Sequence, residues 1–155
     1  MKRSEKVTRF WIEFCASGAG VSMNEPYQVW YFSNSQEMAV ELAELVLAGT
    51  KTATASLAAV NELQPDVTPY EGGFSIVTDL FGEPKCVILT EEVRHVPFDE
   101  VDPQFAFDEG EGDRSLEFWR DVHRSYFSRG AAELGLDFGP RSIVCCERFK
   151  LLYPK

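Results

Sequence analysis

Cysteine is scarce in this sequence, and its spacing does not suit a disulfide framework or a zinc site. The four cysteines are Cys15, Cys86, Cys145 and Cys146, and they contain no Cys-x-x-Cys pair. Small secreted domains and zinc modules need cysteines paired at short intervals. We therefore expect buried, reduced thiols in a cytoplasmic protein.

Long apolar runs are also missing, and positive charge is in short supply. No segment approaches the length that spans a bilayer, and residues 1–6 lead into an amphipathic run without the apolar core of a signal peptide. With 15 Lys and Arg against 25 Asp and Glu, the formal net charge is −10 and the pI is about 4.7. Such a chain is repelled by DNA, by bulk RNA and by anionic membranes, so only a local basic groove would bind RNA.

Several catalytic signatures are absent as well. The sequence has no glycine-rich phosphate loop, no Ser-His-Asp order and no Cys-His pair. Of the two histidines, His95 is ambiguous, and His123 lies on the apolar side of a predicted helix, which favours a buried core histidine. Nine carboxylates lie between Glu91 and Asp113, but their spacing is not that of an EF-hand. We predict neither a metal site nor a cofactor.

What the sequence does contain is enough apolar material for one domain. Its 155 residues are 45% hydrophobic and show no repeats, which predicts a single domain over residues 1–155. Ser33 and Asp113 are predicted to cap two helices. The strands are predicted at 28–32, 52–57, 74–79, 86–93 and 142–152, and the helices around 7–14, 36–48, 101–107 and 116–127. This order predicts an α+β fold built on a small, mostly antiparallel β-barrel with flanking helices.

The most informative stretch follows the second predicted helix, which ends at Gly49. Lys51 comes next, and then the hydroxyl residues Thr52, Thr54 and Ser56 alternate with alanines. One face of this strand would carry hydroxyl groups, and the alanines on the other would let another segment or a ligand come close. Because desolvation lets a lysine lose its proton, this is a candidate reaction site. A solvated lysine after a helix C-cap is the competing interpretation.

Three carboxylates stand out from the many that are simply solvated. Glu109 and Glu111 are each followed by a glycine, which lets the backbone turn tightly and approach a ligand. Carboxylates placed there, just before a helix, could act as a base or bind a donor. Glu147 shares one face of the last strand with apolar residues, so it is either a structural ion pair or functional. We expect it to be buried and hydrogen-bonded to a basic side chain or a hydroxyl.

Four motifs occur in a specific order along the chain. They are Ala48-Gly-Thr-Lys-Thr-Ala-Thr54, Glu109-Gly-Glu-Gly-Asp113, a tryptophan-containing helix and Val144-Cys-Cys-Glu-Arg-Phe149. Together they resemble the ASCH-domain family over nearly the whole chain, from Trp30 to Phe149. The resemblance implies a PUA-like β-barrel with a cleft suited to RNA or a nucleoside. Members of that family have been linked to RNA binding, to ribonuclease action and to hydrolysis of cytidines acylated on the exocyclic amine.

The amidohydrolase members share a Lys-x-x-Thr pair and a distant glutamate, which correspond here to Lys51, Thr54 and Glu109. The glutamate match could instead fall on Glu111, and Thr50 stands where a basic residue is common. The resemblance implies hydrolysis of a small acylated nucleoside. Thr54 would attack or orient a water, Lys51 with a lowered pKa would carry the proton, and Glu109 would orient Lys51 or bind the leaving amine. In a regular strand the side chains of Lys51 and Thr54 would point to opposite faces, because they are an odd number of residues apart. They can meet only if the chain still turns after residue 49.

The remaining predicted contacts surround these three residues. An aromatic side chain, from Trp30, Tyr31 or Trp119, is expected to stack on the base, and backbone amides near Gly110 or Gly112 to hold the oxyanion. The predicted substrate-binding residues are Thr52, Ser56, Trp30, Glu111, Arg114, Trp119 and Glu147. The alternative is an RNA-binding module, possessing or lacking ribonuclease activity, with a groove formed by Lys51, Arg114, Arg120, Arg124 and Arg141.

Overall fold

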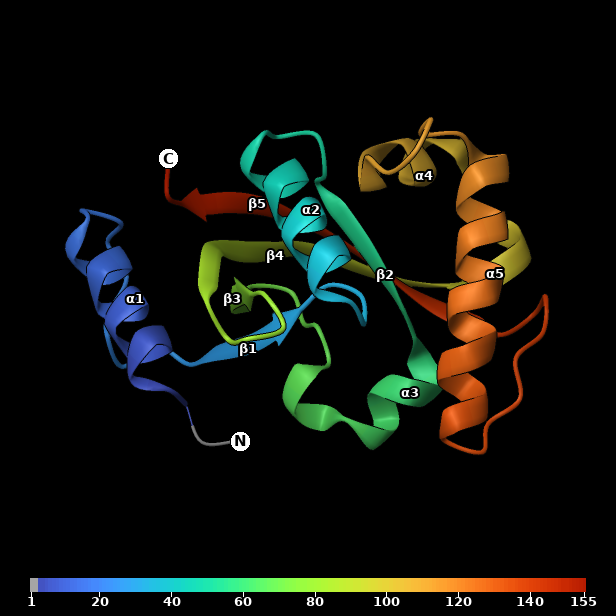
Figure 1. Cartoon of the computed structure of the whole chain (residues 1–155), viewed down its shortest axis with the longest axis horizontal. Helices are drawn as coiled ribbons and strands as arrows, with labels where there is room; N and C mark the ends of the chain where they lie inside the picture. Colours follow the sequence, from blue (N-terminus) through green and yellow to red (C-terminus); the bar gives the residue numbers. More distant parts are fainter. Residues whose placement is uncertain (1–2) are drawn as a thin grey trace.

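The computed structural model describes residues 3–155 and contains one curled five-stranded sheet with helices outside it (Figure 1). Met1 and Lys2, which begin the segment where no signal peptide is expected, lie outside the described residues. The strands are β1 (Tyr27–Tyr31), β2 (Ala53–Leu57), β3 (Phe74–Thr78), β4 (Pro84–Pro97) and β5 (Ile143–Tyr153). Their order in the sheet is β1-β3-β4-β5-β2, which leaves β1 and β2 as the edges of a half-barrel. Only the β1–β3 pair is parallel, so the prediction of a curved, mostly antiparallel sheet is confirmed.

The helices cover the sheet from several sides. They are α1 (Glu5–Ala16), α2 (Gln36–Leu47), α3 (Ala58–Leu63), α4 (Pro103–Glu109) and α5 (Leu116–Glu133), with 3-10 turns at Pro65–Val67 and Phe98–Glu100. The predicted caps were wrong by two residues. Ser35, whose hydroxyl accepts from the Met38 amide, caps α2, and Ser115 caps α5 in the same way. Ser33 instead adopts a left-handed conformation in the turn before α2, and the Asp113 carboxylate accepts from the Ser115 amide.

Three apolar clusters hold the helices to the sheet. Trp11 of α1 packs against β1, β3 and β4, Val46 of α2 packs against β3 and β4, and Trp119 of α5 packs with α4 against β2 and β5. In Figure 1 the α1 and α5 clusters lie at opposite ends of the molecule, with α2 between them. This arrangement fixes α4 and α5 beside the edge strand β2.

The cysteines are all free thiols, as expected. Burial raises the pKa of Cys86 and of Cys146 to about 12 and that of Cys145 to about 11, so these three keep their protons at neutral pH. Among the described residues, no helix is both long and apolar enough to cross a bilayer.

Candidate active site

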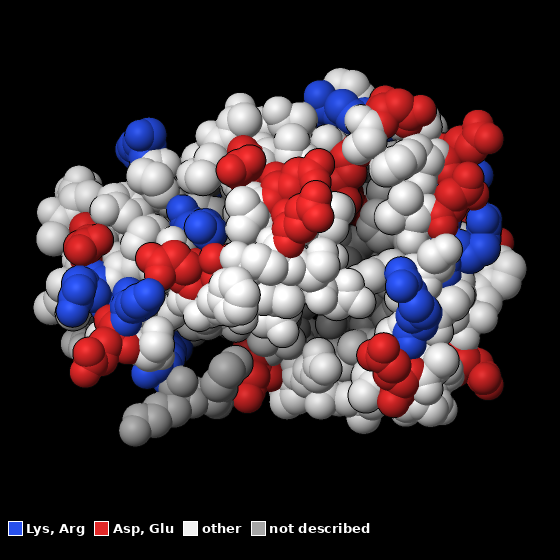
Figure 2. All heavy atoms as spheres, viewed as in Figure 1, with Lys and Arg blue, Asp and Glu red and all other residues white. Residues whose placement is uncertain are grey.

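A cavity of about 530 Å³ lies beside the edge strand β2. Its walls come from the end of β1, the start of α2, from β2, α3 and α5, from the segment after α4, and from Glu147 on β5. Figure 2 shows this face of the molecule hollowed between the α2 and α5 sides, with blue and red side chains scattered around the opening. The volume falls in the range typical of small-molecule sites.

Lys51 reaches this cavity because the chain is still turning where it leaves α2. Gly49 has φ +79°, and the amides of Thr50 and Lys51 both donate to the Leu45 carbonyl, at 2.9 and 3.0 Å. The strand β2 begins only at Ala53, so the direction of the Lys51 side chain does not follow the alternation of side chains between the two faces of that strand. Lys51, Thr54 and Glu109 all line the cavity.

The Lys51 ammonium group is fully enclosed, with 1% of the residue exposed. Its Nζ donates to Glu109 Oε1 at 3.0 Å, to the Glu109 carbonyl at 3.3 Å and to Glu111 Oε2 at 2.9 Å. Burial alone lowers the pKa of Lys51, but the charges of the two carboxylates and their hydrogen bonds outweigh it, and the pKa is raised. The expected partly buried lysine with a lowered pKa is therefore wrong: Lys51 is an ammonium ion at neutral pH.

Glu109 is held as a carboxylate by three donors. Besides Lys51, Trp119 Nε1 donates to its Oε2, and His123 Nε2 lies 3.3 Å from the same oxygen. Burial raises the pKa of Glu109, but Lys51 and then His123 outweigh burial, so the pKa is lowered. His123 Nδ1 lies 2.8 Å from the Trp119 carbonyl, so both ring nitrogens face acceptors. Burial lowers the pKa of His123, yet the Glu109 charge and hydrogen bond raise it overall, which favours imidazolium.

Gly110 lets the Glu109–Glu111 segment press against the Lys51 backbone. Its φ is +74°, and a Cβ atom there would lie 2.6 Å from the Thr50 carbonyl oxygen. The predicted close approach at this glycine is thus present, but to the chain's own backbone. From the sequence we expected backbone amides near Gly110 or Gly112 to hold an oxyanion. The Gly110 amide instead donates to the Phe107 carbonyl at 3.0 Å and is not free for that role.

Thr54 and Glu147 are direct cross-strand partners on β2 and β5. Directly paired residues point to the same face, and both side chains line the cavity. Glu147 is 5% exposed, and Thr90 Oγ1 donates to its Oε2 at 2.6 Å, which confirms the predicted buried, hydroxyl-bonded carboxyl. Burial raises the pKa of Glu147 to about 7, although the Thr90 hydrogen bond and the Lys51 charge oppose this.

Ionisation of Glu147 should therefore weaken the fold as pH rises. Between its ordinary pKa of 4.5 and about 7, the folded state binds more protons than the unfolded state, so this group's contribution to stability falls across that window. Glu147→Gln keeps an acceptor for Thr90 and cannot ionise. As the pH is raised from 5 to 8, we expect the melting temperature of Glu147→Gln to increase relative to that of the parent. A difference in melting temperature that does not change with pH would contradict this.

The other predicted site residues divide into two groups. Trp30, Tyr31, Ser56 and Glu111 line the cavity. The first two lie at the end of β1. Three do not line it. The Thr52 amide bonds the Asp108 carbonyl, the Arg114 guanidinium lies 3.6 Å over the Phe107 ring, and Trp119 is buried behind Glu109.

The arginines of the alternative RNA groove contact protein groups outside the cavity. Arg141 pairs with Asp99, and Arg120 donates to the Asp99 carbonyl. Arg124 pairs with Asp121 on its own helix. Of the five predicted groove members, only Lys51 lines the cavity, and two carboxylates already bind it.

Among the cavity-lining residues that sequence reasoning missed are Asn61, His123 and Tyr126. Asn61 Nδ2 donates to Ser56 Oγ at 2.9 Å, which orients that hydroxyl, and nothing in the sequence signals this. His123 is buried as predicted, but it also contacts Glu109. Its position four residues after Trp119 was the available signal, because such side chains are neighbours on a helix and here stack at 4.2 Å.

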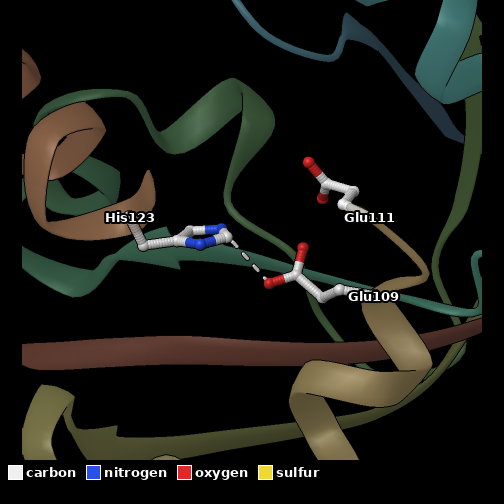
Figure 3. Close-up of side chains that lie close together, drawn as sticks. All are labelled: Glu109, Glu111 and His123. Carbon is white, nitrogen blue, oxygen red and sulfur yellow. Dashed lines mark ion pairs between the residues drawn. The ribbon is translucent and has the colours of Figure 1, made fainter. Parts of the chain in front are cut away.

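Glu109, Glu111 and His123 also form a set that could hold a metal ion (Figure 3). One ligand atom from each lies within 4.8 Å of the others, and carboxylate with imidazole suits zinc. The Lys51 ammonium bonds both of these carboxylates, so a divalent cation would have to displace it. The donor set fits a metal only after that displacement.

A curled half-barrel with flanking helices and a deep cavity at its edge strand defines a PUA-like domain. The chain matches the model of the ASCH domain over residues 28–153 and belongs to that family, whose members are proposed to be RNA-binding proteins or amidohydrolases.

Two crystal structures are similar over most of their length. An ASCH domain from Lactobacillus crispatus JV V101 is 30% identical with a TM-score of 0.87, covering 99% of this chain and 98% of that one. A protein from Enterococcus faecalis V583 is 28% identical with a TM-score of 0.82, covering 96% and 89%. Among curated proteins, no sequence matches.

Proposed function

We propose that this protein is an amidohydrolase that removes the acyl group from N4-acylated cytidine-type nucleosides. The observation that carries the proposal is the convergence of Lys51, Thr54 and Glu109 on one cavity sized for a small molecule. These three residues also correspond to the Lys-x-x-Thr pair and distant glutamate of the amidohydrolase members that the chain resembles.

The charge around the cavity supports a neutral substrate over a polyanion. Lys51, Arg129 and His123 line it together with four carboxyl groups: Glu109, Glu111, Glu133 and Glu147. Positive and negative groups offset each other here, so the cavity lacks the excess of positive charge that a phosphate backbone needs, whereas an uncharged nucleoside does not need it. Trp30, Tyr31 and Tyr126 offer aromatic faces on which a base can stack.

The contacts of Lys51 support a different role from that of the proton carrier expected from the sequence. As an ammonium ion, it would stabilise the oxyanion that forms when the amide carbonyl is attacked. The substrate oxygen replaces the longest of its three hydrogen bonds, the 3.3 Å contact with the Glu109 carbonyl. Glu109, fixed by Trp119 and His123, orients the ammonium group.

Thr54 supplies a hydroxyl to the cavity from β2. We expect Thr54→Ser to keep measurable hydrolysis and Thr54→Ala to lose it, by a factor of about 10² or more, because only serine retains the reacting or water-orienting oxygen. Serine lacks the methyl group that restricts the side chain, so its rate should fall below that of the parent. Steady-state kinetics with N4-acetylcytidine measure both variants. Thr52→Ala, whose side chain does not line the cavity, is the matched control, and equal losses in both alanine variants would contradict the role of Thr54.

The test of the function is one protein preparation assayed in parallel on N4-acetylcytidine and on a labelled single-stranded RNA. Release of cytidine without RNA cleavage supports the proposal. A chelator arm with EDTA separates the ammonium-based site from a metal bound by Glu109, Glu111 and His123, since only the latter would lose activity. RNA cleavage or tight RNA binding without amide hydrolysis would favour the alternative RNA module.

A further inference from the structure

One buried carboxyl group in the cavity is not committed to any ion pair. Among the described residues, Glu147 makes one hydrogen bond, from Thr90 to Oε2. The only fully buried side-chain nitrogen or oxygen atom without a partner in residues 3–155 is Nε of Arg120. Oε1 of Glu147 is therefore open to the cavity, next to the cross-strand partner Thr54.

Three other ionisable groups of the site, Lys51, Glu109 and His123, are unsuited to accept a proton from a nucleophile, and Glu111 is bonded through its Oε2 to the Lys51 ammonium group. Lys51 is already protonated, and its three hydrogen bonds go to Glu109 and Glu111. Glu109 accepts from Lys51, Trp119 and His123, and the charges of Lys51 and His123 lower its pKa, so its carboxylate is weakly basic. His123 has both ring nitrogens against acceptors. Amide hydrolysis nevertheless needs a group that takes up one proton and then releases it.

We propose that Glu147 is the general base and general acid of this site, acting on the hydroxyl at Thr54 and on the leaving nitrogen. This inference rests on the proposed amidohydrolase function and adds to it the residue that moves the proton. A carboxyl whose pKa lies near 7 is well matched to both halves of that task at neutral pH. The apolar neighbours along β5 and the Thr90 hydrogen bond fix its position.

The proton balance closes within the cavity. Oε1 of Glu147 takes the proton from the attacking hydroxyl, the new C–O bond forms, and the carbonyl π pair moves onto the oxygen beside Lys51 Nζ. When that pair returns, the C–N bond breaks, and the exocyclic nitrogen takes the proton from Glu147. Attack by water releases amine and carboxylic acid directly, whereas attack by Thr54 leaves an ester that one water hydrolyses through the same two proton transfers.

The groups around Glu147 predict how its titration would respond to substitution. Lys51 from the turn before β2 and Thr90 from β4 both lower the pKa of Glu147. Cys145 lies two residues away on β5 and keeps its proton. Across the cavity lie Glu109, Glu111 and His123; burial raises the pKa of Glu111 and the Glu109 charge raises that of His123 against the effect of burial, so Glu111 and His123 are the rival groups.

The experiment is a pH profile of kcat/KM on N4-acetylcytidine for the parent, Glu147→Gln and Thr90→Val. We expect the parent to gain activity through pH 7 and Glu147→Gln to lose about 10²–10⁴-fold, with that rise abolished. Thr90→Val removes the hydrogen bond that favours the carboxylate, so its rise should move to higher pH. Glu92→Gln, on the neighbouring strand and outside the cavity, is the matched control and should behave like the parent.

The outcomes separate the two proposals. Hydrolysis by the parent together with an unchanged rate in Glu147→Gln would overturn the role of Glu147 and leave the amidohydrolase function standing. A weakened Glu147→Gln variant that keeps the parent's rise near pH 7 would assign that rise to Glu111 or His123 and also overturn the role of Glu147. A folded parent that does not hydrolyse the substrate would overturn the function and the inference together. Should Glu147→Gln not fold, the direction of the shift in Thr90→Val decides.

Discussion

Lys51→Ala should abolish amide hydrolysis and weaken the fold at the same time. Loss of one donor that stabilises an oxyanion costs about 10²–10³-fold in kcat. The substitution also leaves Glu109 and Glu111 facing each other without the cation between them, and breaking a buried pair in this way costs about 3–5 kcal/mol. Urea denaturation and kinetics on N4-acetylcytidine measure the two losses separately.

A double variant separates the catalytic loss from the structural one. In Lys51→Ala/Glu111→Gln, one of the two opposed charges is gone, so stability should recover in part while hydrolysis stays absent. The single Glu111→Gln variant completes the cycle. A double variant that regains the parent's rate would show that Lys51 serves only to neutralise the carboxylates, and the oxyanion role would have to be abandoned.

Gly110→Ala should damage both the fold and the site. A left-handed backbone costs alanine about 1–2 kcal/mol, and overpacking adds about 1–3 kcal/mol because the new Cβ would meet backbone atoms of Thr50 and Lys51. Relief of that contact moves Glu109 away from the Lys51 ammonium. We therefore expect a lower free energy of unfolding and slower hydrolysis, measured by denaturation and kinetics.

Gly135→Ala is the matched control for this substitution. Gly135 has a similar φ of +69°, but a Cβ atom there meets nothing within 4 Å. It should carry the conformational cost alone and leave hydrolysis untouched. If the two alanine variants lose the same free energy of unfolding, the new contact of the Cβ atom at Gly110 does not affect stability.

Much of the fold could be predicted because its signals are local. Alternation placed Glu147 among apolar side chains on β5, and the structure confirms its burial. Helical periodicity located α2 and α5, whereas their caps were misplaced because serine or aspartate occurs at both candidate positions, two residues apart. A choice between two good caps depends on the turn before the helix, which sequence patterns do not show.

The protonation state of Lys51 could not be predicted in the same way. Burial and charge pairing act on its pKa in opposite directions, so the sign depends on how many carboxylates come within hydrogen-bond distance. Glu109 was a candidate partner from the resemblance, but the second contact, with Glu111, depends on the tight turn at Gly110. Thr52 was misassigned to the cavity for a related reason, since the turn after Gly49 sends its amide to Asp108.

The pairing of β2 with β5 alone has a consequence for synthesis of the protein on the ribosome. Ala53 pairs with Arg148, and Thr54 with Glu147, so the nascent chain must carry β2 as a bare strand edge until β5 has left the exit tunnel. Until then Thr54 and Glu147 are not brought together, and under the proposed mechanism the unfinished chain cannot act on its substrate. An exposed edge of this kind invites pairing with other chains, which makes the interval before β5 emerges the time when the protein is most in need of a chaperone.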